Sequence, residues 1–447
     1  MKGSRPLRIV GVVVAVLVLT IVGIVYWQSA NHDASPASPD ADVAPSRGPR
    51  VAVLPFLNAS GDPDQDYFAH GLTEDIITEL SKLQGLSVIA HRSTFEYKGK
   101  SVGARQVGAD LGVRYVLEGS VRRAGERIRV NAQLSDASDG MRLWADSFER
   151  DSTVTDLFSL QDELTQQVVN AIAGSYGALS RAEIAEARRK PPASLDSYDC
   201  VLRAYEYLQV HSEENHFAAR DCLEKAVERD PDYTDAWAWL AYLYGDEFHH
   251  QWNPRPESYD SLDKALEAAE HAVRLDQTSQ VAHAMLGTTY RLRRELDRFR
   301  VEADRAIAIN PNNALWLGLL GSGLTQVGDW ERGIPLAKRA FELNPNPPPW
   351  IYMSFFLDHY RNRRYEEALA EAQRAETEDY RAHVFRVAAY GQLGRAEEAQ
   401  GELSELREQF SGTPDELRQA LLEQYGFTAE MVDHMLEGLA KAGLEVE

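Results

Sequence analysis

Four titratable residues that stand close together are the strongest candidates for metal chemistry. Asp246, Glu247, His249 and His250 supply carboxylate and imidazole groups, which can bind a divalent ion. The zinc-protease spacing, two histidines at i and i+4 with an intervening glutamate, is missing. We therefore expect no metal. We interpret the insertion that continues to Ser258 as a surface flap that extends a binding groove.

A run of alternating aspartates contains half of a calcium-binding pattern. Asp62, Asp64 and Asp66 have the spacing of the first calcium ligands in a helix–loop–helix site. Such a loop needs glycine at its sixth position and a bidentate glutamate at its twelfth, and Tyr67 and Thr73 stand there instead. We expect a solvated turn that leads into the next helix.

The remaining chemical motifs do not support catalysis. Gly99, Lys100 and Ser101 end like a phosphate-binding loop, but Thr94 replaces the glycine that the loop needs five residues earlier. No Ser–His–Asp, Cys–His or paired-carboxylate arrangement occurs in a recognisable context. The sequence therefore predicts a protein that is not an enzyme and that holds no cofactor.

Composition points to a globular, acidic chain. Its 447 residues contain 47 Lys and Arg against 69 Asp and Glu, a net charge of −22, with 44% hydrophobic residues. A surface of that charge repels phosphate backbones, so we expect no nucleic acid partner.

The only two cysteines, Cys200 and Cys222, fall on the two helices of one predicted hairpin that turns near Ser212. We favour free buried thiols. A disulfide is the alternative if the compartment is oxidising and the Cα atoms lie within about 7 Å.

The N-terminus carries a membrane-targeting pattern. Lys2, Arg5 and Arg8 precede an uncharged apolar run over residues 9–27, close to the roughly 20 residues that a spanning helix needs. The basic flank predicts a cytoplasmic tail over residues 1–8 and export of the rest. A cleaved signal peptide is the alternative. Residues 28–50 have the composition of a flexible linker.

A small mixed α/β domain is predicted over residues 51–176. A buried strand begins it, and Ile128, Val130, Ala132 and Leu134 alternate with polar residues in a strand that has one buried face. The predicted strands cover 51–56, 86–90 and a meander around 127–134, and the predicted helices cover 67–83, 104–111 and 155–172. The order is therefore a βαβα arrangement, then a meander, then a helix.

Helical repeats occupy the second half. Ala272, Ala306 and Ala340 are 34 residues apart (306 − 272 and 340 − 306), which is the period of tetratricopeptide repeats (TPRs). We place a linker helix over 177–194, six repeats over 195–410 and capping helices over 411–447.

Several segments resemble one family. "VAVLPFLNASGDPDQDYFAHGLTEDIITELSKL" and "YVLEGSVRRAGERIRVNAQLSDASDGMRLWADSFERD" resemble the TolB-like amino-terminal domain of bacterial signalling proteins, and "YDCVLRAYEYL" and "GDWERG" resemble the TPR region that follows it. This combination is similar to the sensory half of adenylate cyclase-linked and CadC-like membrane regulators. We find no output domain before the apolar run, where such regulators carry one.

The fold class that follows is multidomain: an N-terminal transmembrane helix, a small mixed α/β domain, then an all-α TPR superhelix. The resemblance implies a single-pass protein of the bacterial inner membrane with most of its mass in the periplasm. We expect a non-catalytic adaptor or sensor that binds a protein or peptide in the TPR groove. The alternative is a detached regulatory subunit that controls a separate adenylate cyclase or transcription regulator, with a membrane protein as partner.

The TPR pattern also predicts which side chains face the groove. These residues, from the first helices of successive repeats, are Asp235, Tyr242, Thr288, Arg291, Ser322, Thr325 and Arg381.

Overall fold

The computed structural model describes most of the chain after the predicted linker. The described residues are 48–83, 85–151, 157–174, 176–191, 194–250, 252, 259–344, 347–375 and 380–444. The predicted cytoplasmic tail, transmembrane helix and nearly all of the linker lie outside them. Within these described ranges, no helix has both the length and the apolar character that a membrane span requires.

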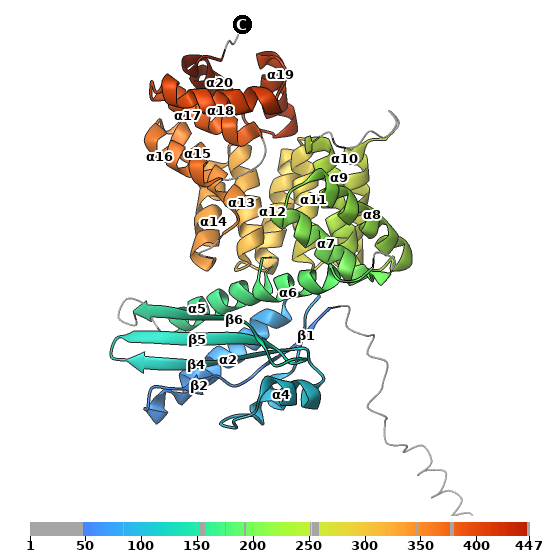
Figure 1. The fold of residues 1–447 in the computed structure, drawn as a ribbon, viewed down its shortest axis with the longest axis vertical. Helices are drawn as coiled ribbons and strands as arrows, with labels where there is room; N and C mark the ends of the chain where they lie inside the picture. The colour runs from blue at the N-terminus through green and yellow to red at the C-terminus, as the bar shows by residue number, and fades with distance from the viewer. Residues whose placement is uncertain are drawn as a thin grey trace, which may run out of the picture. The chain divides into compact units, whose positions relative to one another are not determined.

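The first described part is a mixed β-sheet with helices against it (Figure 1). The strand order is β3-β1-β4-β5-β6, and β2 also pairs with β4. β1 lies parallel to β3 and β4, whereas β4, β5 and β6 form an antiparallel meander. The elements are β1 (Arg50–Val53), β2 (Leu57–Asn58), η1 (Pro63–Gln65), α2 (Asp66–Ser81), β3 (Ser87–Val88), α3 (His91–Phe95), α4 (Ala104–Leu111), β4 (Tyr115–Ala124), β5 (Arg127–Asp136), β6 (Arg142–Asp151), α5 (Leu157–Ala173) and α6 (Ala178–Ala187).

The alternation in β5 confirms the predicted two-faced strand. Ile128, Val130, Ala132 and Leu134 are each no more than 2% exposed and pack with residues of α2 and α5. Apolar side chains alternate with polar ones along a strand, so one face covers the core and the other meets water. The larger core of this domain therefore lies between the sheet and those two helices, and a smaller one joins Val107 of α4 to Ala52 and Val116 of the sheet.

The rest of the described chain is a TPR-like helical region in which consecutive helices pair (Figure 1). The pairs are α7 (Ser197–Gln209) with α8 (Glu213–Arg229), α9 (Thr234–His250) with α10 (Ser261–Leu275), α11 (Gln280–Leu292) with α12 (Leu296–Ile309), α13 (Ala314–Gln326) with α14 (Trp330–Leu343), α15 (Tyr352–Arg361) with α16 (Tyr365–Arg374) and α17 (Tyr380–Gln392) with α18 (Ala396–Gln409). A short helix η3 (Pro349–Ile351) precedes α15, and α19 (Pro414–Gln419), the π-helical turn η4 (Ala420–Gln424) and α20 (Ala429–Ala442) complete it.

The alanines of the 34-residue period lie where helices touch. Ala272, Ala306 and Ala340 are all 1% exposed or less, in the second helices of their pairs. A small side chain at this position lets two helix backbones approach each other. The 34-residue spacing of these alanines therefore marks the contacts between helices. Pro345, which shares the period, lies outside the described residues.

Helices α5 and α6 connect the sheet to the repeats. The Asn170 side chain of α5 donates to the Asn312 carbonyl at 3.2 Å and accepts from the Ala314 amide at 3.3 Å. In α6, Glu183 accepts a hydrogen bond from the buried Tyr115 hydroxyl of β4 and pairs with Arg114 at 3.2 Å. The segment predicted as a linker helix therefore packs against the sheet through specific polar contacts.

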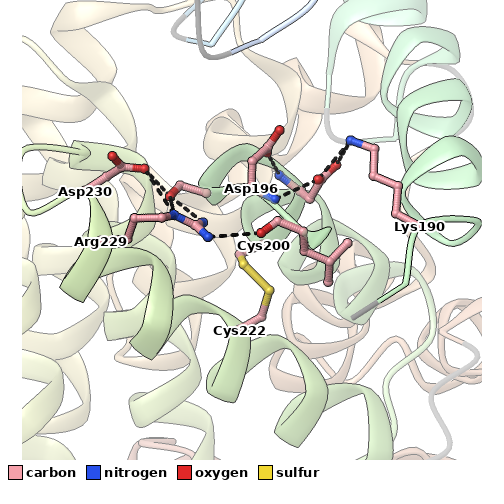
Figure 2. The surroundings of a disulfide bond; sticks show 9 residues. Lys190, Asp196, Cys200, Cys222, Arg229 and Asp230 are labelled. Carbon is pink, nitrogen blue, oxygen red and sulfur yellow. Dashed lines mark hydrogen bonds and ion pairs between the residues drawn. A yellow bond between two sulfur atoms is a disulfide. The ribbon is translucent and has the colours of Figure 1, made fainter. Parts of the chain in front are cut away.

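Cys200 and Cys222 form a disulfide between α7 and α8 (Figure 2). Our preference for free thiols was therefore wrong. The two cysteines lie on facing sides of the helix pair, and their Cα atoms are 5.2 Å apart, within the range that a disulfide needs. Polar contacts surround the bond: Lys190 pairs with Asp199 at 2.7 Å, and Arg229 donates to the Leu195 carbonyl at 3.0 Å.

Candidate functional site

The helical region contains a cavity of 1610 Å³. Its walls come from the first helices of successive pairs, α9, α11, α13 and α17, from the segment after α7, and from the C-terminal segment around η4. In a stack of helix pairs the first helices line the concave side, so a cavity at this place follows from the repeat architecture. Small-molecule pockets usually measure about 300–1,000 Å³, and this cavity is larger.

Five of the seven residues predicted to face the groove line this cavity. They come from four different helices and are Tyr242, Thr288, Arg291, Ser322 and Arg381. Thr288 and Ser322 already have partners: Thr288 donates to the Ala284 carbonyl at 2.9 Å, and the Ser322 hydroxyl lies 2.7 Å from that of Ser354. The aromatic and guanidinium side chains therefore provide most of the chemistry for a ligand.

The structure places the other two predicted residues elsewhere. Thr325 has no exposed surface, donates to the Gly321 carbonyl and faces α14, where a Cβ added to Gly333 would meet its amide nitrogen at 2.8 Å. Asp235 lies in the first turn of α9 on the side of the α/β domain, since a Cβ added to Gly85 would lie 3.8 Å from its Oδ2 atom. Both predictions used the helical period alone, which does not fix how far each helix is rotated about its axis.

Asp235 gives a stability prediction. Its side chain is buried and its Oδ1 atom has no hydrogen-bond partner among the described residues. Burial, with the charge of Asp276, raises the pKa of Asp235 from 3.8 to about 6. A raised carboxyl pKa means that the folded state holds the proton more tightly. The resulting stability is present below pH 4, is lost as the pH rises to 6, and stays lost above it.

Asp235→Asn is therefore expected to raise the free energy of unfolding at pH 7 by about 2 kcal/mol and to flatten its pH dependence between pH 4 and 6. Urea unfolding of the full chain across this range measures both effects. The matched change at the neighbouring exposed Asp232, to Asn, should alter stability by less than about 0.5 kcal/mol. Equal effects at the two positions would contradict the account of Asp235.

Arg291 is a buried cation in the cavity wall. It is 8% exposed, and its Nη1 atom donates to the Gln326 side-chain oxygen at 2.9 Å and to the Tyr425 carbonyl at 3.3 Å. Burial, followed by the repulsion of Arg381, lowers the pKa of Arg291 to about 10, so it stays charged at neutral pH. Both of these hydrogen-bond partners are neutral, and within the described residues the nearby Asp246 carboxylate attracts Arg291 without forming an ion pair with it. A buried charge whose hydrogen-bond partners are neutral is costly, and an anionic ligand would reduce that cost.

Arg381 and Tyr425 form the wall near Arg291. The guanidinium carbon of Arg381 lies 4.2 Å from the centre of the Tyr425 ring, which is a cation–π contact. Tyr425 directly follows η4, and π-helical turns often occur at functional sites. The C-terminal segment, which we predicted only as a cap, thus contributes directly to the cavity.

The prediction of a surface flap is wrong for the first residues of that segment. Asp246, Glu247, His249 and His250 belong to the last turns of α9, and both carboxylates are buried. Glu247 pairs with Arg220 at 2.7 Å inside the protein, whereas Asp246, His249 and His250 line the cavity. The residues that follow, 251 and 253–258, lie outside the described residues.

Sequence reasoning missed several cavity residues. His211, Trp252 and Tyr425 line the cavity but come from segments between helices, where the TPR period carries no information. The sequence does contain a signal for His211, which lies between the helices of the first pair, about one repeat before Asp246 and His250 at the end of α9.

Comparison with known proteins agrees with the two-part architecture. Residues 47–167 match the family of the HilA/YgeH-like transcriptional regulator, second domain. The chain therefore carries a mixed α/β domain of a kind found in regulators, followed by a TPR-like region, and the resemblance to regulatory proteins is confirmed.

A curated relative extends this likeness. "Putative adenylate cyclase 3" of Rhizobium meliloti (strain 1021) is 40% identical over 273 residues, which cover 61% of this chain and 45% of that protein. This chain thus matches less than half the length of that relative.

Solved structures give weaker likenesses. Pseudomonas aeruginosa PilF is 18% identical over 48% of this chain and 93% of its own, with a TM-score of 0.35. YrrB, described as a TPR protein with an unusual peptide-binding site, is 19% identical over 45% of this chain and 95% of its own, with a TM-score of 0.29. At these scores the fold assignment rests on the helix pairs and the 34-residue period described above.

Proposed function

We propose that this protein is a non-catalytic adaptor or sensor that binds a segment of a partner polypeptide in the cavity of its TPR-like region. The observation that carries the proposal is Arg291, a buried cation without a carboxylate partner among the described residues, in the wall of a cavity too large for a typical small-molecule site. Arg, Tyr and Trp, the residue types that dominate binding energy at protein interfaces, gather around it.

The chemistry of the wall specifies the ligand further. The charges of Arg291 and Arg381 repel each other, and a carboxylate placed between them would reduce that repulsion. Arginine can donate two parallel hydrogen bonds to a carboxylate. The partner segment is therefore expected to present an acidic side chain or a C-terminal carboxylate there, with apolar side chains against Trp316 and Tyr242.

The proposed location is the periplasmic side of the inner membrane, with residues 9–27 as the anchor. The basic flank and the apolar run support it. The disulfide between Cys200 and Cys222 also supports an oxidising compartment, because disulfides are rare in reducing ones.

The second candidate function is that of a regulatory subunit for a separate adenylate cyclase or transcription regulator. The family match over residues 47–167 and the cyclase-named relative favour it. It would bind its partner in the same cavity, so the two candidates differ in the identity of the partner and not in the mode of binding.

Site-directed photo-crosslinking in native membranes tests the proposal. A photoreactive amino acid at Thr288 or Leu319, both in the cavity wall, is expected to capture one and the same polypeptide. Val301, 49% exposed and absent from the cavity lining, is the control position. The same adducts from Val301, or none from either cavity position in a folded protein, would remove the cavity as the binding site. A captured cyclase or regulator would select the second candidate function.

A further inference from the structure

We propose that His211, Asp246 and His250 form a binding site for a divalent transition-metal ion of the zinc class in the wall of the cavity. This inference concerns different side chains from the proposed carboxylate site and does not depend on the partner polypeptide.

Two adjacent elements bring the three ligands together. Asp246 and His250 are four residues apart on α9, so their side chains project from one face of the helix. His211 follows α7 in the preceding helix pair and reaches the same place. One candidate ligand atom from each of the three residues lies within 4.8 Å of the other two.

The distances suit a small ion. The Nε2 atoms of His211 and His250 are 3.2 Å apart, and His211 Nε2 lies 3.8 Å from Asp246 Oδ2. Zinc binds imidazole nitrogen and carboxylate oxygen at about 2.0–2.2 Å, and tetrahedral geometry then places ligand atoms roughly 3.3–3.5 Å from one another. A small movement of Asp246 would therefore complete three corners of a tetrahedron.

Neighbouring side chains hold two of the ligands in position. The buried Tyr207 hydroxyl donates to Asp246 Oδ2 at 2.9 Å, and the Trp252 ring stacks on His250 with 4.3 Å between ring centres. The 2.7 Å contact of Tyr207 with His211 uses Nε2, so a bound ion would replace it. Outer contacts that orient ligands typically change metal affinity by about 10–100-fold when they are lost.

The donor set selects the class of ion. Two imidazoles and one carboxylate suit zinc, copper, nickel and iron(II), whereas magnesium and calcium prefer sites made only of oxygen. The positive charge of Arg381, which lines the same cavity, disfavours a weakly held cation there. The fourth position would be open to the cavity, because all three ligands line it.

A second cluster of histidine and glutamate side chains serves as a control for non-specific zinc binding. His70 and Glu74 on α2 and His91 on α3 also bring ligand atoms within 4.8 Å of one another, in the α/β domain. Its glutamate side chain is 53% exposed. If zinc merely bound any histidine cluster of this chain, both groups would contribute equally.

The experiment is zinc titration of the untagged, chelator-treated full chain in detergent, by calorimetry and thermal melting. We expect one tight site per chain and a rise in melting temperature with zinc. The isosteric Asp246→Asn and the double variant His211→Ala/His250→Ala should each weaken this site by at least about tenfold, and Tyr207→Phe should weaken it without abolishing it. His70→Ala/His91→Ala should leave it unchanged.

Cobalt(II) gives an independent readout, because the visible spectrum of the bound ion reports its ligands even if a variant is destabilised. The assignment would be supported if the unmodified chain gives the cobalt spectrum of a tetrahedral site and if Asp246→Asn alters that spectrum. Absence of binding by the unmodified chain would overturn the proposal. So would undiminished binding by Asp246→Asn and the His211/His250 variant, or loss of the tight site only in the His70/His91 variant.

Discussion

Replacing Gly391 by alanine is expected to lower the free energy of unfolding by about 2–3 kcal/mol, the range for overpacking a tight core. Gly391 lies in α17 where it crosses α20, and a Cβ there would stand 1.8 Å from the Gly438 carbonyl oxygen. Gly438 in turn has the Ala388 carbonyl 2.4 Å from its own Cβ position. Because backbone meets backbone on both sides, no side chain can move aside to relieve the clash.

A loss of stability on Gly391→Ala would run against helix propensity, because alanine is intrinsically the better helix former by up to about 1 kcal/mol. Such a loss would therefore report the close packing of the two helices. Gly401 in α18 is the matched control: it is exposed, and its added Cβ would meet no atom within 4 Å. Gly401→Ala should therefore stabilise the protein by about 0.5–1 kcal/mol. Urea unfolding of the full chain measures both changes. Hydrogen exchange should show that Gly391→Ala loosens α20 first. A stabilising Gly391→Ala would mean that α20 does not pack on α17 as described.

Much of the fold could be predicted because its elements have strong periodic signals. The two-residue period of β5, the helix over residues 104–111 and the buried alanines 34 residues apart all match the structure. Short elements were missed for the opposite reason. β2 and α3 contain two and five residues, too few for a period to be visible.

The cavity was predicted less well because it depends on helix rotation and on segments between helices. Tyr242 and Arg291 line the cavity, whereas Thr325 lies between α13 and α14, and Asp235 lies beside the α/β domain. His211 and Tyr425 reach the cavity only through tertiary packing. The disulfide was uncertain for a similar reason, because residue spacing does not reveal whether two cysteines face each other across a helix pair.

We expect Arg291 to bind a carboxylate of the partner segment. Arg291→Ala is expected to weaken binding by about 30-fold, which corresponds to about 2 kcal/mol, the threshold of an interface hot spot. Arg291→Lys keeps the charge but loses the paired hydrogen bonds, so it should have a smaller effect. Arg298→Ala, at a position 62% exposed on α12, is the matched control and should change affinity little.

The most direct measurement is a double-mutant cycle on the full chain, with a synthetic peptide of the crosslinked segment. Binding is measured for the unmodified protein and Arg291→Ala, each with the peptide carboxylate intact and replaced by an amide. Circular dichroism must first show that the variant is folded. If Arg291 and the carboxylate interact, the loss caused by Arg291→Ala should largely disappear with the amide peptide, leaving a coupling energy of about 1–3 kcal/mol. If Arg291→Ala weakens binding of both peptides equally, Arg291 does not contact the carboxylate. That result would contradict the account and leave Arg291 with only a structural role, through its hydrogen bonds to Gln326 and Tyr425.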